Sequence, residues 1–160
     1  MPTAADPLIE LARQIRGDTL RLLAAAPQEW LTWAPPGTSN HMLWHAGHAL
    51  WVSDVLILEP ITGQSELPPD WADAFGMDCR PVNLTRDWPS RATIQQHLAE
   101  QLRRIDQLLA DLPSDRLNDP RPVLGSRSLL SSIVHGLHDE AKHQGEMYLL
   151  LKLCRAREIG

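Results

Sequence analysis

Hydrophobic side chains recur at the three-to-four-residue spacing of buried helix faces in four separate segments of the chain. These segments are residues 6–26, 40–58, 90–112 and 126–156. The second segment is apolar nearly all round, which is typical of a helix buried on most of its sides. No segment shows the strict alternation of a half-buried strand. The pattern therefore predicts an all-α protein, built as an antiparallel four-helix bundle.

Residues near the helix ends indicate where the helices begin and stop. Thr38 or Ser39 can cap the second helix, because a short hydroxyl side chain accepts a hydrogen bond from a free backbone N–H. Pro60 is expected to stop that helix, since proline lacks the N–H and disfavours helical backbone before it. Ser126 or Ser128 is expected to open the fourth helix.

A long connection, residues 59–89, separates the second and third helices. It is rich in Pro, Gly and Asp and has no helical periodicity. A loop of this length inside a compact domain is usually functional or disordered. Its four large apolar residues, Trp71, Phe75, Met77 and Trp88, favour a packed loop. The first and third connections are short, and the long one can cross an end of the bundle.

Composition narrows the classes of function. The 160 residues are expected to form a single domain, residues 1–160, with 43% hydrophobic and 22% charged residues. The net charge is −5 and no basic run is present, which argues against nucleic-acid binding. The longest apolar stretch, residues 46–58, contains His48, Ser53 and Asp54, so no membrane span is expected.

The cysteines and the first residues indicate the compartment. Cys79 and Cys154 are too few for a disulfide framework and have no metal-binding spacing. The chain shows no basic and apolar leader at its start. We therefore expect a reduced, cytoplasmic protein.

Six of the seven histidines fall in two clusters. The second helix holds His41, His45 and His48, and the fourth holds His135, His138 and His143, whereas His97 stands alone and reads as a surface side chain. His48 continues an apolar stripe that a bundle turns inward. An imidazole there needs partners for both nitrogens, so it is either a hydrogen-bonded core residue or a metal ligand.

The fourth helix carries the spacing of a metal site. Asp139 and His143 are four residues apart and project from one face, one turn apart. Borderline ions such as Zn, Ni or Fe(II) accept imidazole and carboxylate together. His138 is five residues from His143, which is poor spacing for sharing an ion, and His135 can orient the site from one turn before Asp139. Gly145, a helix-weakening residue, is expected to admit a close neighbour.

Several familiar patterns do not fit. The two histidines His138 and His143 are too far apart for H-E-x-x-H, and Glu140-x-x-His143 is only one copy of the paired di-iron element. No motif of a covalent-nucleophile enzyme is present. The competing interpretation is that Asp139 and Glu140 are a solvated charge pair and that every histidine is an ordinary core or surface group.

Two segments together resemble the DinB/YfiT-like superfamily of bacterial metal-binding four-helix bundles. Residues 39–49, SNHMLWHAGHA, look like the family's second-helix segment, and residues 139–146, DEAKHQGE, are similar to its fourth-helix pattern H-x-x-x-H-x-G-Q. The helix order and the long connection match as well. The resemblance implies His48 and His143 as metal ligands, with Asp139 at the remaining position. The family pattern has His at that place, so His138 is the alternative, and Glu146 stands where the pattern has Gln and can reach the site.

The resemblance also implies a function. Family members with assigned activity are thiol transferases or isomerases that use low-molecular-weight thiols. By this resemblance we expect an enzyme that depends on a divalent transition metal (Zn, Ni or Fe). Its possible reactions are thiol transfer and hydrolysis of a small molecule. The alternative is a non-catalytic metal-binding or dimerising stress-response module. A homodimer is expected from the apolar excess of the second helix and from the family likeness.

Overall fold

The computed structural model describes residues 3–81, 86–121, 125 and 127–159. The elements in this part of the chain are helical, apart from a single bridge between Pro120 and Ser128. The long helices are α1 (Asp6–Ala25), α2 (Met42–Ser53), α5 (Arg91–Ala110) and α6 (Leu129–Ile159). The short ones are η1 (Gln28–Trp30), η2 (Asp54–Leu58), α3 (Glu59–Thr62), α4 (Trp71–Phe75) and η4 (Ser114–Asn118). The predicted all-α bundle with a long connection after its second helix is confirmed.

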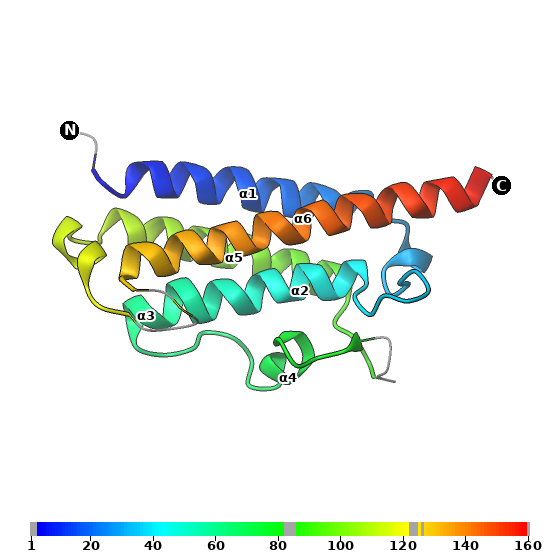
Figure 1. Cartoon of the computed structure of the whole chain (residues 1–160), viewed down its shortest axis with the longest axis horizontal. Helices are drawn as coiled ribbons and strands as arrows, with labels where there is room; N and C mark the ends of the chain where they lie inside the picture. The colour runs from blue at the N-terminus through cyan, green and yellow to red at the C-terminus, as the bar shows by residue number, and fades with distance from the viewer. Residues whose placement is uncertain (1–2, 82–85, 122–124, 126, 160) are drawn as a thin grey trace.

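The four long helices form two parallel pairs that run in opposite directions (Figure 1). In the first pair, α1 and α6 run the same way: Arg16 contacts Glu140, and further along both segments Trp30 contacts Glu158. Helices α2 and α5 form the second pair. The expected strictly antiparallel order is therefore not found. Instead of crossing an end of the bundle, the long connection returns along the side of α2, where it carries α4.

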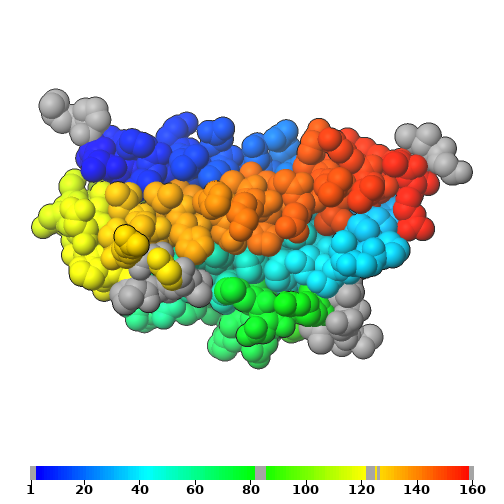
Figure 2. Space-filling view, viewed as in Figure 1, coloured from blue at the N-terminus to red at the C-terminus, as the bar shows by residue number. Residues whose placement is uncertain are grey.

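Helix α2 is the core of the bundle. Each of its residues from Met42 to Leu50 is buried, which confirms the prediction from its apolar sequence. Figure 2 shows α6 lying between α1 and α2 on the visible face, so α6 covers much of that side. Within the described residues, none of the helices has the length and apolar character that crossing a membrane requires.

The second helix continues past its expected stop at Pro60. A π turn over η2 leads directly into α3, which ends at Thr62 where Gly63 takes the left-handed conformation (φ 85°). Pro60 has no N–H for the carbonyl of Leu56. The side chain of Ser132 on α6 donates to that carbonyl instead, at 2.6 Å. The proline is tolerated because a neighbouring helix supplies the missing donor.

The residue that caps α2 is His41, not Thr38 or Ser39 as expected. The Nδ1 atom of buried His41 accepts a hydrogen bond from the Trp44 N–H at 3.0 Å. The hydroxyl of Thr38 instead donates to the carbonyl of Pro35 within the preceding turn. A neutral imidazole nitrogen is thus the acceptor at this helix start, although Ser, Thr and Asn are the usual residues there.

Helix α6 begins directly after one of the two expected serines. The Ser128 hydroxyl accepts from the Ser131 N–H at 3.2 Å, and the Ser131 hydroxyl accepts from the Ser128 N–H at 2.9 Å. This reciprocal arrangement satisfies donors at the helix start in the manner of a capping box. The other candidate, Ser126, lies outside the described residues.

A buried ion pair joins α1 to α6 at the centre of the bundle. The guanidinium of Arg16 donates to Glu140 at 2.9 and 3.0 Å, to Ser53 at 3.1 Å and to Gln101 at 3.0 Å. The hydroxyl of Thr19 donates to Glu140 at 2.6 Å. Both charged side chains are only 2% exposed. The interpretation of Glu140 as a solvated charge is therefore wrong, and its role is to hold the helices together.

The long connection is packed against α2, as its aromatic residues predicted. Trp71 and Phe75 are buried and Trp88 is half-buried, whereas Met77 is 58% exposed and does not belong to the core. The start of the connection is fixed by Asp54, whose buried carboxylate accepts from the Ser65 hydroxyl at 2.5 Å. These contacts hold the connection beside the middle of α2.

Candidate metal centre

Three residues of the predicted metal site lie together between α2 and α6. The Nε2 atom of His48 is 3.3 Å from the Oδ2 atom of Asp139, and the Nε2 atom of His143 is 3.4 Å from the same oxygen. One donor atom from each residue lies within 4.8 Å of the other two. His48 comes from α2, and the other two residues come from consecutive turns of α6. The structure thus brings together residues that are 91 and 95 positions apart in the sequence.

The ring of His48 is held in one orientation. Its Nδ1 atom lies 2.6 Å from the backbone carbonyl of Phe75. A carbonyl oxygen only accepts, so Nδ1 carries the proton and the Nε2 lone pair faces Asp139. The ring also stacks on Trp44, with centroids 4.6 Å apart and planes 21° from parallel, and lies 5.3 Å from the ring of Trp51. Both nitrogens of this buried imidazole therefore face a fixed neighbour, Nδ1 the Phe75 carbonyl and Nε2 the Asp139 carboxylate.

Gly47 explains how the Phe75 carbonyl reaches His48. A Cβ atom at position 47 would lie 2.2 Å from the ring of Phe75, closer than any real contact. Glycine at this position lets the end of α4 lie directly on α2. The close approach brings the carbonyl of Phe75 within hydrogen-bond distance of Nδ1 of His48. A residue in the body of the helix thus controls the orientation of its neighbour in the site.

Asp139 supplies a carboxylate oxygen without a hydrogen-bond donor. Among the described residues, its buried Oδ2 atom has no such partner, while Lys142 lies 3.6 Å from the other oxygen. Burial raises the pKa of Asp139, but His143 and His48, which when protonated offer it hydrogen bonds and positive charge, outweigh burial and bring the pKa below its ordinary value. The group is an ionised carboxylate at neutral pH.

The donor set fits a divalent transition metal. The Nε2 atoms of His48 and His143 converge on the anionic Oδ2 atom of Asp139, which is buried without a hydrogen-bond donor among the described residues, and a cation between these three atoms would balance its charge. Ligand distances of about 2.0–2.1 Å in a tetrahedral site separate the ligand atoms by roughly 3.3–3.4 Å. The observed separations of 3.3 and 3.4 Å match that spacing. Two imidazoles and one carboxylate suit Zn and similar ions.

His45, for which no role was predicted, extends the site on the side away from Asp139. Its Nδ1 atom lies 2.8 Å from Nδ1 of His143, and its Nε2 atom lies 3.2 Å from a carboxylate oxygen of Glu146. Burial, followed by the positive charges of His143, His48 and His41, lowers the pKa of His45 to about 3. His45 is therefore neutral at physiological pH.

The spacing of His45, His143 and Glu146 would also suit a metal ion. However, the close contacts use opposite nitrogens of the His45 ring, and one ion cannot bind both. The arrangement is a series of contacts that runs from His143 through His45 to Glu146, away from the first site. Glu146, which the sequence placed one turn from the site and within possible reach of it, contacts His45.

The remaining histidines lie outside these groups. His138, the alternative third ligand, is exposed on α6. His135 is half-buried one turn before Asp139 and lines the adjoining pocket, where we expected an orienting residue. His97 is half-buried, with its ring 4.6 Å from that of Trp71, so it is not a free surface side chain.

The glycine that lets α6 approach the end of the second helix, at η2, is Gly136, not Gly145. A Cβ at position 136 would lie 3.2 Å from a side-chain carbon of Ile57 and 3.3 Å from one of Leu56. Gly145 is exposed, and none of the described atoms would lie within 4 Å of a Cβ there. The expectation that Gly145 admits a close neighbour is therefore wrong.

The candidate site opens into a pocket of about 600 Å³. Aromatic and aliphatic side chains form one part of its wall, and polar groups from the long connection and α6 form another. The lining residues outside the candidate ligands are Ser39, Asn40, Trp44, Trp51, Val52, Leu56, Met77, Arg80 and His135. Asp139 is the one acidic residue among the lining residues, and Arg80 is the one permanent cation.

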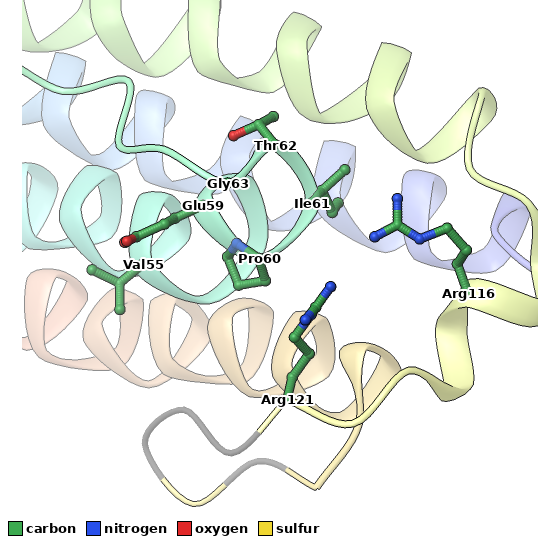
Figure 3. Close-up of a pocket in the computed structure, with 8 residues that line it drawn as sticks. All are labelled: Val55, Glu59, Pro60, Ile61, Thr62, Gly63, Arg116 and Arg121. Carbon is green, nitrogen blue, oxygen red and sulfur yellow. The ribbon is translucent and has the colours of Figure 1, made fainter.

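A second pocket, of about 490 Å³, lies at the end of α3 (Figure 3). The guanidinium groups of Arg116 and Arg121 point toward Pro60 and Ile61, and Glu59 lies on the same rim. Asp119 already pairs with Arg116 at 3.1 Å. This pocket contains no histidine and none of the predicted site residues, so the chemistry of the site lies elsewhere.

Comparison with known proteins identifies the family and agrees with the fold. A family model described as the DinB superfamily matches residues 11–147. A crystal structure of a conserved protein from Enterococcus faecalis superposes with a TM-score of 0.72 and 14% sequence identity, covering 96% of this chain and 98% of that chain. At this identity the likeness shows the fold alone. No curated protein matches the chain in sequence.

Proposed function

The chain belongs to the DinB superfamily, and on that premise we propose that it is an enzyme dependent on one divalent transition metal. In this proposal His48, Asp139 and His143 are the ligands, and the reaction is transfer of a low-molecular-weight thiol or hydrolysis of a small molecule. The observation that carries the proposal is the convergence of two imidazole nitrogens, at 3.3 and 3.4 Å, on one carboxylate oxygen, with all three donor atoms within 4.8 Å of one another. Zn, Ni and Fe(II) all suit these donors.

His48, Asp139 and His143 would hold the ion. A divalent ion there would supply Lewis acidity, which lowers the pKa of a thiol or water and so provides a nucleophile at neutral pH. The protein's own contribution is to orient the ligands and exclude water. Trp44 and the Phe75 carbonyl hold His48, while Asp139 supplies one negative charge, which leaves the site a net positive charge for an anionic nucleophile.

The pocket supports a small substrate with both apolar and anionic parts. Its volume of about 600 Å³ suits a metabolite and not a folded partner. Trp51, Val52 and Leu56 offer apolar surface next to the ligands. Arg80, held by hydrogen bonds from its Nη1 atom to the carbonyls of Met77 and Cys79, presents the remaining face of its guanidinium. We propose that this cation attracts a carboxylate of the substrate or of the thiol.

We also propose a cytoplasmic homodimer. Helix α2 offers little surface for a dimer contact, because all its side chains except half-buried Trp51 are buried in the bundle. Exposed apolar residues of α6 are a better candidate: Tyr148 is 52% exposed, Leu149 is 55% and Leu153 is 36%. Light scattering of the wild type and of the Leu149→Glu variant tests this contact, with a monomeric mass expected for the variant.

The direct test of the metal site is elemental analysis of protein purified without a His tag and without chelator. We expect one transition-metal ion per chain in the wild type and loss of the ion in His143→Ala, with unchanged far-ultraviolet circular dichroism. The matched control is His138→Ala, which removes an exposed histidine of the same helix and should keep the ion. A metal-free wild type that does not take up Zn, Ni or Fe(II) would refute the site.

Activity is tested separately on the metal-loaded protein with a panel of thiols and electrophiles. Turnover that is lost in Asp139→Asn and kept in His138→Ala supports the enzyme. Stoichiometric metal with no turnover across the panel favours the alternative function, a metal-binding or dimerising stress-response module. The two measurements therefore distinguish the site from the reaction.

A further inference from the structure

We infer that the pocket beside α3 is a second binding site, separate from the candidate metal centre. Its ligand is a small molecule that joins a carboxylate or phosphate group to an apolar body. The inference goes beyond the proposed function and does not depend on it. It rests on the guanidinium groups of Arg116 and Arg121, which point into a pocket of about 490 Å³ (Figure 3). Cavities of this volume take metabolite-sized ligands.

One carboxylate, that of Asp119, holds the two arginines together. The Nε atom of Arg116 donates to Oδ2 of Asp119 at 3.1 Å, and the Nη2 atom of Arg121 lies 3.9 Å from the same oxygen. The backbone of Asp119 is itself fixed on both sides. Its N–H donates to the carbonyl of Arg116 at 3.0 Å, and its carbonyl accepts from the N–H of Leu129 at 2.9 Å. Two cations are therefore held close together around a single anion.

The two guanidinium groups have more donors than Asp119 can use. Each arginine carries five N–H donors and keeps its charge in proteins. The Nε atom of Arg121 is buried and has no hydrogen-bond partner among the described residues. Within the same part of the chain, the side chain of Arg116 donates through its Nε atom alone. A charged donor that is withdrawn from water without an acceptor is unfavourable, so this pair of arginines favours a further anion.

The opposite wall of the pocket is apolar. Val55, Pro60 and Ile61 line it, next to the two guanidinium groups. The carboxylate of Glu59 lies on the other side of Pro60 from the arginines, and it forms no ion pair with either of them (Figure 3). Planar guanidinium groups bind the paired oxygens of carboxylates and phosphates. The pocket thus fits a ligand with an anionic group at one end and an apolar body.

Titration of the protein with benzoate, phenyl phosphate and inorganic phosphate tests this site. Nuclear magnetic resonance follows the backbone amides of residues 61–63 and the Nε–H groups of the two arginines. We expect saturable shifts with the aromatic anions, and weaker binding of inorganic phosphate, which lacks the apolar body. Whichever of benzoate and phenyl phosphate binds more tightly identifies the preferred anionic group. Benzamide, the neutral analogue of benzoate, should not saturate the site, and added NaCl should weaken the binding of the anions.

Variants locate the bound anion. Arg116→Gln and Arg121→Gln should each bind the preferred aromatic anion about 10- to 100-fold more weakly, as expected when a charged hydrogen-bond donor is lost. Arg155→Gln is the matched control, because it removes the same charge from an exposed position near the far end of α6, and it should bind as the wild type does. Circular dichroism checks that each variant is folded.

His143→Ala separates this site from binding of the anion to a metal ion. The two pockets share no lining residue, so this variant should keep the wild-type affinity for the anion even though it loses the candidate metal site. Loss of anion binding in His143→Ala would place the anion at the metal centre and overturn the inference.

Three further results would overturn the inference. The first is the absence of saturable shifts at residues 61–63 with both aromatic anions. The second is equal binding of benzamide and benzoate, which would make the pocket an apolar site without anion recognition. The third is wild-type affinity in both Arg116→Gln and Arg121→Gln. None of these results changes the expected metal content, so the proposed function is decided by its own test.

Discussion

Asp139 and Glu140 are neighbouring carboxylates that should respond to substitution in opposite ways. Asp139 faces the candidate metal site, while Glu140 faces the centre of the bundle and binds Arg16. We expect Glu140→Gln to destabilise the fold with the metal site intact in the folded fraction. We expect Asp139→Asn to abolish metal binding with little change in stability. Sequence position alone does not distinguish the two residues.

The magnitude for Glu140 follows from its contacts. Its carboxylate accepts from two nitrogens of Arg16 and from the hydroxyl of Thr19, and both charged side chains are 2% exposed. Replacing the carboxylate by a neutral amide leaves the guanidinium buried without a counter-charge. Breaking one side of such a pair costs about 3–5 kcal/mol. For a chain of this length, that lowers the melting temperature by roughly 6–20 °C.

The magnitude for Asp139 is smaller, because its buried Oδ2 atom has no donor among the described residues. The amide group introduced by Asp139→Asn would donate to the Nε2 lone pair of His48 or His143, so the unfolding free energy of the metal-free protein should change by less than about 1 kcal/mol at pH 8. Metal binding should fall below detection, because the anionic ligand is lost.

Urea titration of the metal-free proteins at pH 8 gives both free energies, and elemental analysis gives the metal content. Glu140→Gln should lose stability and keep its metal, whereas Asp139→Asn should keep its stability and lose its metal. Equal destabilisation by both substitutions would contradict the assignment of separate roles. Full metal content in Asp139→Asn would show that another residue, such as His138, is the third ligand.

Further predictions concern glycine and pH. Gly145→Ala should raise the unfolding free energy by up to about 1 kcal/mol, because Gly145 lies in open helix surface. Gly47→Ala should lower it by about 1–3 kcal/mol and weaken metal binding, since the added methyl displaces Phe75. Urea titration checks both. Burial lowers the pKa of His41 to about 4 from an ordinary 6.5. The unfolded state therefore binds the proton more readily below pH 6.5, and stability is lost as the pH falls from 6.5 through 4. This group should remove about 2–3 kcal/mol between pH 7 and pH 4.5. His41→Asn, which still caps Trp44, should lack that part of the pH dependence; an unchanged acid limb would show that other groups cause it.

Much of the fold could be predicted from the helical spacing of apolar residues. Helices α1 and α5 match the expected segments closely, since each has one clear apolar stripe and a stop at its end. The prediction that the second helix stops at Pro60 was wrong. Whether proline stops this helix depends on the Ser132 hydroxyl of another helix, which the local sequence around Pro60 does not reveal. The predicted cap of α2 was wrong for a related reason: buried His41 takes a role that exposed Thr38 or half-buried Ser39 was expected to fill.

The candidate site was predicted as far as spacing on one helix and family likeness reach. Which residues of α2 contact which residues of α6 could not be predicted. Because α2 and α6 run in opposite directions, a step from His48 back to His45 corresponds to a step from Asp139 forward to His143. Once the contact of His48 with Asp139 is known, the contact of His45 with His143 follows from it. The sequence, however, does not give the register between the two helices. The same lack concealed the pairing of Glu140 with Arg16.

The long connection has a further consequence for how this protein can change. Since α2 and α5 are parallel, the chain must return along α5, a helix of 20 residues and so about 30 Å long. About nine extended residues would cover that distance, and the chain uses residues 63–90. The extra residues of this segment supply Met77 and Arg80 to the pocket but no candidate ligand. Under the proposed function, exchange of this segment between relatives would therefore be a route to new substrate preferences on an unchanged candidate metal site, provided that the contact of Phe75 with His48 is kept.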